Sequence, residues 1–218
     1  MVADHKGLFI AIDGIHGCGK TAVVKRLAGR SSKRGYSVIA TREIGGSKLG
    51  EKIRKLMDDL DADKDAEASL LLVLAARAQH VEQLIRPSLA QNKVIITDRF
   101  TPSTYVYQYY CIEQFYQKEN MLETVKHLND FATNGLSPDI TIILDVPVDI
   151  ALDRKSQSQS IGKWEKKELK YHQRAREGYL HFAQIENWDI VNAGQSLKTV
   201  IEDVEKLVIP LLPCLDKA

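Results

Sequence analysis

A glycine-rich loop between an apolar run and a helical run constrains the fold of this chain most. Residues 12–21 read IDGIHGCGKT, in which Gly14 is followed by four residues and then by Gly19, Lys20 and Thr21. Glycines at this spacing let backbone N–H groups turn inward around a phosphate. The apolar run LFIAID precedes the loop, and TAVVKRLAGR follows it with helical spacing. This strand–loop–helix context predicts a nucleoside triphosphate site.

The side chains of this loop are expected to divide by role. Lys20 is expected to reach the terminal phosphates, and the Thr21 hydroxyl to bind Mg²⁺. Cys18 lies near the start of the helix, where a thiol can be reactive; the alternative is that it is a small residue that simply fits. The residues predicted to surround the triphosphate are Gly14, Ile15, His16, Gly17, Cys18, Gly19, Lys20 and Thr21.

Charge and composition exclude several other classes of protein. The net charge is +1, from 30 basic and 29 acidic residues, which argues against broad binding to nucleic acid or to an acidic membrane. No run is long enough to span a bilayer, and the N-terminal residues do not resemble a secretory signal. Cys18, Cys111 and Cys214 are far apart and lack metal-ligand spacing, so we expect reduced thiols in a cytoplasmic protein.

The pattern of apolar runs predicts an α/β fold. Residues 8–13, 94–98 and 140–146 read as buried parallel strands, and 36–41 and 188–192 as weaker ones. Helical spacing fills the intervals, for example at 50–60 and 67–90. We therefore predict one domain over residues 1–218, with a doubly wound five-stranded parallel sheet flanked by helices on both faces. The polar stretch 153–170 is either a flexible lid or a solvated loop.

Two further predicted strand ends carry side chains that suit phosphate binding. Arg42 could grip a second phosphate with its planar fork, or it could form a surface pair with a glutamate. Asp98 and Arg99 follow the strand at 94–98 and are expected beside the phosphate loop. The next helix begins with polar groups, and Ser103 or Thr104 is a candidate N-cap. These polar groups are Ser103, Thr104, Tyr107 and Gln108.

Taken in order, these segments resemble the thymidylate kinase family of P-loop nucleoside monophosphate kinases over nearly the whole chain. FIAIDGIHGCGKT is similar to the family's first strand and phosphate loop, and TREIGGSKLGEKIR to its TREPGGTxLGExIR. LLVLAARAQHVEQLIRPSL resembles the helix LLFxADRAQHxxxxIxPAL, and DRFTPSTYVYQ resembles DRYxxSTxAYQ. PDITIILDVPVDIALDR and NAGQSLKTVIEDV match the fourth strand and the closing motif. The resemblance implies phosphorylation of dTMP with Mg·ATP in a chain that tends to form homodimers.

The resemblance also implies a role for each matching residue. Arg42 and Arg99 would hold the acceptor phosphate, and Arg77 would hydrogen-bond the base. Asp98 would orient either the water ligands of the metal or the acceptor side of the site. Arg154 would lie over the adenine of ATP, and residues of about 153–167 would form the lid. The implied acceptor site comprises His16, Arg42, Val73, Arg77, Arg99, Ser103, Thr104, Tyr107 and Gln108.

The chain departs from the family pattern mainly on the acceptor side. His16 stands where a carboxylate usually accepts from the 3′-hydroxyl, and Val73 where phenylalanine stacks on thymine. Ala76 replaces an aspartate that could orient Arg77, and Ile44 replaces the proline of REPGG. These changes leave two alternatives open. The enzyme could phosphorylate another deoxypyrimidine monophosphate such as dUMP or dCMP, or the chain could be a non-catalytic, regulatory nucleotide-binding protein.

The predicted lid differs as well. Phosphoryl transfer needs positive charge on the transferring group, and Gly17 leaves the phosphate loop without an arginine. GKWE at 162–165 stands where one branch of the family has DRxE, so we expect Lys163 to supply that charge. A lysine neutralises charge but cannot bridge two oxygens in a planar fork.

Overall fold

A computed structural model describes residues 7–59, 64–156 and 169–212. It contains the predicted parallel sheet of five strands, in the order β2-β3-β1-β4-β5. The observed strands lie within about two residues of the predicted ranges. They are β1 (Leu8–Asp13), β2 (Val38–Arg42), β3 (Val94–Asp98), β4 (Ile140–Asp145) and β5 (Asp189–Asn192).

The central strand is continuously apolar because both faces of the sheet are covered. All six residues of β1 are buried. Side chains alternate between the two faces of a strand: Ile10 belongs to a core cluster with Val23 and Leu27 of the first helix, and Phe9 to a separate cluster with Ile85 and Leu89. A parallel sheet packed on both faces leaves its strand ends as the accessible edge.

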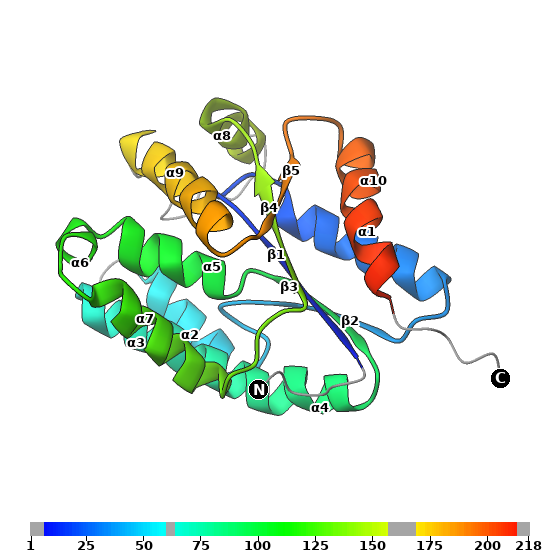
Figure 1. Cartoon of the computed structure of the whole chain (residues 1–218), viewed down its shortest axis with the longest axis horizontal. Coiled ribbons are helices and arrows are strands. Elements are labelled where there is room, and N and C mark those ends of the chain that lie inside the picture. Colours follow the sequence, from blue (N-terminus) through cyan, green and yellow to red (C-terminus); the bar gives the residue numbers. More distant parts are fainter. Residues whose placement is uncertain (1–6, 60–63, 157–168, 213–218) are drawn as a thin grey trace.

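Helices cover the two faces unequally (Figure 1). Helices α1 (Lys20–Lys33) and α10 (Leu197–Val208) lie on one face. The other face carries most of the remaining helices, with α2 (Lys48–Asp58) packed on α3. These helices are α3 (Ala66–His80), η1 (Val81–Ile85), α4 (Arg86–Ala90), α5 (Thr101–Thr104), η2 (Tyr105–Tyr110), α6 (Glu113–Tyr116), α7 (Met121–Thr133) and α9 (Leu169–Ile185). Helix α8 (Val148–Ser156) follows β4, and η3 (Ile209–Leu211) follows α10.

Two helices differ in detail from the sequence prediction. The helix expected at 67–90 is divided into α3, the π-helical η1 and α4. The prediction that Ser103 or Thr104 caps the next helix is wrong, because both lie inside α5 and its N-cap is Phe100, without a side-chain cap. Ser103 Oγ instead donates to the Asp13 carboxylate, and Thr104 Oγ1 accepts from Arg77.

The sheet register brings three charged residues to one edge, because β1, β2 and β3 end at Asp13, Arg42 and Asp98. Asp98 at the end of β3 pairs with Ile12 of β1 on one side and with Arg42 of β2 on the other. The loops after β1, β2 and β3 therefore leave the sheet side by side, at the edge where parallel α/β sheets bind ligands.

Parts of the sequence prediction fall outside the described residues. Lys163 lies there, as do residues 157–167 of the predicted lid, and Cys214. Within residues 7–59, 64–156 and 169–212, no helix has the length and apolar character needed to cross a bilayer.

Candidate active site

The loop between β1 and α1 has the backbone path that a phosphate cradle needs. Gly14, Gly17 and Gly19 have φ values of 139°, 82° and 101°, a region that side chains with a Cβ rarely enter. A Cβ atom on Gly17 would lie 2.1 Å from the carbonyl oxygen of Ala151, and one on Gly14 would lie 2.6 Å from that of Leu144. Glycine is therefore required at both positions, and the loop packs against α8 and the end of β4.

Lys20 is held inside the curve of this loop. Its Nζ donates to the carbonyl oxygens of Gly14 at 3.0 Å and Ile15 at 2.9 Å, and lies 3.6 Å from the sulfur of Cys18. The side chain is buried, and Lys20 is the first residue of α1. An ammonium at this position adds to the positive end of the helix, so the loop suits a polyphosphate.

Thr21 and Asp98 form an oxygen pair beside the loop. Thr21 Oγ1 donates to Asp98 Oδ2 at 2.6 Å, so the first turn of α1 and the end of β3 bring the two groups close together. A hydroxyl and a carboxylate are hard ligands that suit Mg²⁺, which usually binds one or two protein oxygens plus phosphates and water. Among the residues that the structure describes, no three His, Cys, Asp or Glu side chains gather as a metal site. The donor set thus fits a magnesium ion that is held largely by nucleotide phosphates.

Asp13, which the sequence reasoning did not single out, is the buried centre of the site. Its carboxylate accepts from the backbone N–H groups of Gly14 at 2.9 Å, Phe100 at 3.2 Å and Ser103 at 3.0 Å. It also accepts from the hydroxyls of Ser103 at 2.9 Å and Tyr179 at 2.8 Å. One side chain therefore connects the phosphate loop to the start of α5 and to α9. An aspartate that ends a buried strand directly before the loop is the sequence signal that could have identified it.

Arg99 lies over this centre. Its Nη1 donates to Ser103 Oγ at 2.7 Å, and its Nη2 lies 3.2 Å from His16 Nε2. Burial alone would lower the pKa of Arg99, but the phenols of Tyr107 and Tyr179 and the carboxylates of Asp13 and Asp98 raise it well above its usual value. Its backbone φ of 76° is unusual for a residue with a side chain. Arg99 is thus a permanent cation in a fixed orientation.

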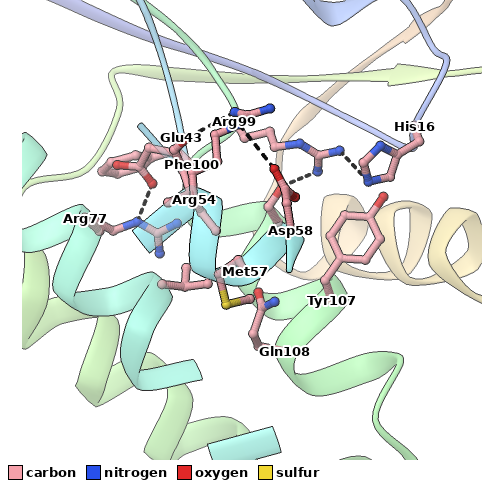
Figure 2. Close-up of a pocket in the computed structure, with 13 residues that line it drawn as sticks. His16, Glu43, Arg54, Met57, Asp58, Arg77, Arg99, Phe100, Tyr107 and Gln108 are labelled. Atoms are coloured by element: carbon pink, nitrogen blue, oxygen red, sulfur yellow. Dashed lines mark hydrogen bonds and ion pairs between the residues drawn. The ribbon is translucent and has the colours of Figure 1, made fainter. Parts of the chain in front are cut away.

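A pocket extends from Arg99 to Arg77 between α2, α3 and the segment after β3. Figure 2 shows Arg99 and His16 at one end of the view and Arg77 with Glu43 at the other. Ten of the lining residues are labelled there, and the whole lining comprises His16, Glu43, Ile44, Arg54, Met57, Asp58, Val73, Arg77, Arg99, Phe100, Ser103, Tyr107 and Gln108. The pocket therefore has a polar, cationic end beside the phosphate loop and a partly apolar end with one buried guanidinium.

The guanidinium of Arg77 is fixed by partners from three other segments. Its Nε donates to Glu43 Oε2 at 2.8 Å, and its Nη1 donates to Thr104 Oγ1 at 2.9 Å and to Asn129 Oδ1. Arg77 also lies over the ring of Phe100, with 4.9 Å from Cζ to the centroid. Ala76 replaces an aspartate of the family pattern, but Arg77 is oriented without it.

Glu43 connects Arg77 to a buried histidine. His80 Nδ1 lies 3.0 Å from Glu43 Oε1, and its Nε2 lies 2.8 Å from Thr41 Oγ1. Burial opposes the ionisation of Glu43, but the charge of Arg77 and the hydrogen bond from His80 outweigh it and lower the pKa of Glu43. The ionised carboxylate therefore balances the charge of the Arg77 cation inside the protein.

Two predicted arginines have other partners in the structure. Arg42 ends β2 and donates from Nη2 to both carboxylate oxygens of Glu51, at 3.2 and 3.1 Å, in an exposed pair. It is outside the lining of the pocket. Arg154 donates to the carbonyl oxygens of Ala193 at 2.8 Å and Gln195 at 3.4 Å, which places α8 against the loop after β5. Their proposed contacts with phosphate and adenine remain predictions.

The pocket also contains Arg54 of α2, which the sequence reasoning missed. Its Nη1 donates to the carbonyl oxygen of Ile44 at 3.0 Å, and its Nε lies 3.8 Å from Asp58. Arg54 thereby holds the turn in which Ile44 replaces proline. It is the last residue of the segment TREIGGSKLGEKIR, where the family pattern TREPGGTxLGExIR also has arginine, and this match was the signal that could have identified it.

A P-loop on a parallel sheet, next to a cationic pocket, defines a phosphotransferase of the nucleotide kinase class. The family model for thymidylate kinase matches residues 12–204. This chain belongs to the thymidylate kinase family.

Individual relatives agree with this assignment. The thymidylate kinase of Maridesulfovibrio salexigens is 38% identical over 212 residues, covering 93% of this chain and 95% of the relative. That of Geotalea uraniireducens is 40% identical over 203 residues, covering 88% and 92%. The crystal structure of thymidylate kinase from Ehrlichia chaffeensis aligns with a TM-score of 0.73 at 28% identity, covering 93% of this chain and 98% of that one.

Proposed function

We propose that this protein transfers the γ-phosphoryl group of ATP to dTMP, with Mg²⁺ bound to the nucleotide phosphates. The observation that carries this proposal is the pocket between Arg99 and Arg77, which opens beside the phosphate loop. One end of this pocket is cationic and the other is partly apolar. This arrangement suits a nucleoside monophosphate, with the phosphate at Arg99 and the base at Arg77. The family membership supplies the choice of dTMP.

The proposed roles of the side chains follow from their positions. Lys20 and the loop amides hold the donor phosphates, and Thr21 with Asp98 holds the magnesium ion, which neutralises charge on those phosphates. Arg99 and Arg54 hold the acceptor phosphate, so that its oxygen faces the donor. Since the transition state is loose, this positioning and charge neutralisation account for most of the catalysis. Lys163 stays the predicted source of further positive charge.

At the other end of the pocket, Arg77 is placed to read a base. The hydrogen bonds to Glu43, Thr104 and Asn129 fix its orientation, and a guanidinium can only donate. It therefore favours a base with a carbonyl oxygen at that edge, as thymine and uracil have, over cytosine with its amino group. Tyr107 and Gln108 line the neighbouring wall, and we propose that they face the sugar.

An assay of acceptor preference tests the proposed function. ADP release is measured with Mg·ATP and dTMP, dUMP, dCMP, dGMP or UMP in turn. We expect dTMP to have the highest kcat/KM and dCMP to be poor. A higher kcat/KM for another monophosphate would assign His16 and Val73 to a changed specificity. Binding of ATP with no turnover on any acceptor would favour the regulatory alternative.

Restoring an aromatic wall at position 73 should tighten acceptor binding. Val73 is buried and lines the pocket, but it lacks a ring to stack on the base. An aromatic contact contributes about 1 kcal/mol, so Val73→Phe should lower the dTMP dissociation constant about fivefold in calorimetric titration. Val73→Leu, which adds volume without a ring, is the control. Equal effects of the two substitutions would show that the base does not stack at this position.

His16 should make acceptor binding depend on pH. A guanidinium only donates, so a hydrogen bond across the 3.2 Å between Arg99 Nη2 and His16 Nε2 requires this ring nitrogen to accept. Protonation would place two cations side by side, and histidines ordinarily change charge between pH 5 and 8. We expect KM for dTMP to rise as the pH falls from 8 to 5.5 in the wild type and to change much less in His16→Asp. Parallel profiles of the two proteins would contradict this.

We also propose that two copies of the chain associate through α3. Leu71 is 57% exposed and Ala75 is exposed one turn further on, and Phe131 of the neighbouring α7 is 86% exposed. Leu71→Glu should convert a dimer to a monomer in sedimentation equilibrium, because a charge replaces an apolar contact. Ile209→Glu, on the exposed 3₁₀ turn after α10, is the control that should leave the mass unchanged. A wild-type monomer would refute the proposed association.

A further inference from the structure

The proposed site depends on the direction in which Arg99 points, and the structure shows what sets that direction. Nη1 of Arg99 has two hydroxyl oxygens as neighbours, Ser103 Oγ at 2.7 Å and Tyr179 OH at 3.4 Å. Ser103 is four residues from Arg99, whereas Tyr179 comes from α9, 80 residues away. Two separate segments therefore meet at one nitrogen of the guanidinium.

Asp13 determines which way the two hydroxyl protons point. The hydroxyls of Ser103 and Tyr179 donate to the same oxygen, Asp13 Oδ1, at 2.9 and 2.8 Å. The two hydroxyl oxygens also lie 3.1 Å from each other, but each hydroxyl has only one proton. With both protons directed at Asp13, their lone pairs are left to accept from Arg99. A carboxylate accepts and never donates, and thus Asp13 leaves both oxygens as acceptors for Nη1.

The surroundings keep this arrangement in one protonation state. Tyr179 is 1% exposed. Burial and the neighbouring Asp13 raise the pKa of its phenol well above the ordinary value, so the hydroxyl keeps its proton. The Tyr179 ring packs edge-on against the ring of Tyr107, with centroids 5.9 Å apart, and Tyr107 lies under the Arg99 guanidinium at 5.1 Å. The phenol of Tyr179 is therefore held on its ring side as well as at its hydroxyl.

From this geometry we propose that Tyr179 is a positioning residue for phosphoryl transfer: with Ser103, and with proton directions set by Asp13, its hydroxyl orients Arg99 toward the acceptor phosphate. The inference rests on the proposed function of the Arg99 end of the pocket. Because Asp13 also accepts from the N–H of Gly14 at 2.9 Å, the same carboxylate fixes the donor loop and the acceptor arginine relative to each other.

Removal of the Tyr179 hydroxyl tests this role. Tyr179→Phe keeps the buried ring, so we expect a folded protein with kcat for dTMP about tenfold lower and KM for ATP unchanged within about twofold. The matched control is Tyr105→Phe, a buried tyrosine that packs against Phe182 and Trp188, for which we expect wild-type kinetics. An unchanged kcat in Tyr179→Phe would overturn the proposal.

A second arginine variant separates positioning from a general structural effect. Lysine at position 99 has no Nη1, so Tyr179→Phe should cause no further loss in an Arg99→Lys background. A tenfold loss that persists in this background would mean that Tyr179 acts independently of Arg99, which would also overturn the proposal. Ser103→Ala with Tyr179→Phe should lose more than either single variant, because neither of the two hydroxyls is then left to accept from Nη1.

A measurement without substrate separates this inference from the proposed function. In nitrogen-15 NMR of the nucleotide-free protein, rotation of the Arg99 guanidinium should be slow in the wild type and in Tyr105→Phe, and faster in Tyr179→Phe. Equal rotation rates in all three proteins would refute the positioning role. A wild-type enzyme that does not phosphorylate dTMP would instead refute the proposed function, and the NMR comparison would still decide the role of Tyr179.

Discussion

Substitution of Arg99 by alanine should lower kcat for dTMP phosphorylation by about 10²- to 10³-fold. Its guanidinium is a permanent cation beside the phosphate loop, fixed through Nη1 by Ser103 and close to His16 through Nη2. The charge that develops on the transferring phosphoryl group would then lose one of the two arginines, Arg99 and Arg54, that we propose hold the acceptor phosphate. The measurement is steady-state ADP release at saturating ATP and dTMP, so that weakened binding does not obscure the loss of turnover.

Two other arginines give this prediction its comparison. Arg34, at the C-terminal end of α1 away from the phosphate loop, pairs with Glu205 of α10 at 2.7 Å, and Arg34→Ala should keep wild-type turnover. Arg42→Ala tests the role that the resemblance implies, since Arg42 pairs with Glu51 in the structure. A small effect of Arg99→Ala, with a large effect of Arg42→Ala, would transfer the phosphate-binding role from the end of β3 to the end of β2.

Neutralising Glu43 should destabilise the protein by about 3–5 kcal/mol at pH 7, because it leaves the buried Arg77 cation without its carboxylate. Arg77 and Glu43 are 1% and 6% exposed, and their Nε–Oε2 distance is 2.8 Å. The measurement is the free energy of unfolding in urea for wild type and Glu43→Gln. The control is Glu51→Gln, whose exposed pair with Arg42 should contribute about 1 kcal/mol or less.

The difference between wild type and Glu43→Gln should itself depend on pH. The pKa of Glu43 is lower in the folded protein than its usual value of 4.5, so the folded state favours the ionised form. That stabilisation is fully present above the pKa of the unfolded state and is lost as the pH falls through the lower pKa of the folded state. The two unfolding free energies should therefore begin to converge as the pH falls below 4.5, the usual pKa of the carboxyl group. A difference that stays constant from pH 7 to pH 3 would contradict the assignment of an ionised Glu43.

The phosphate loop and the sheet follow from local patterns, and both were predicted. A strand buried on both faces, such as LFIAID, can be recognised from its own residues alone. The spacing of the glycines between Gly14 and Thr21 likewise predicts the path of the loop. The helix boundaries were less accurate. Ser103 and Thr104 look like caps in sequence, but their hydroxyls bind Asp13 and Arg77 inside the site. A local rule failed there because tertiary partners competed for the same hydroxyls.

The sequence by itself determined the class of the fold, the place of the triphosphate loop and, through family motifs, the reaction. The tertiary structure alone decided which side chains hold the others in place. Asp13 meets Tyr179 across 166 residues, Arg77 meets Glu43 and Asn129 across 34 and 52, and Arg54 turns into the pocket as Arg42 pairs outside it. The reason is physical: strand and loop signals lie in neighbouring residues, whereas a buried charge selects its partners from whatever segments the folded sheet brings within hydrogen-bond distance.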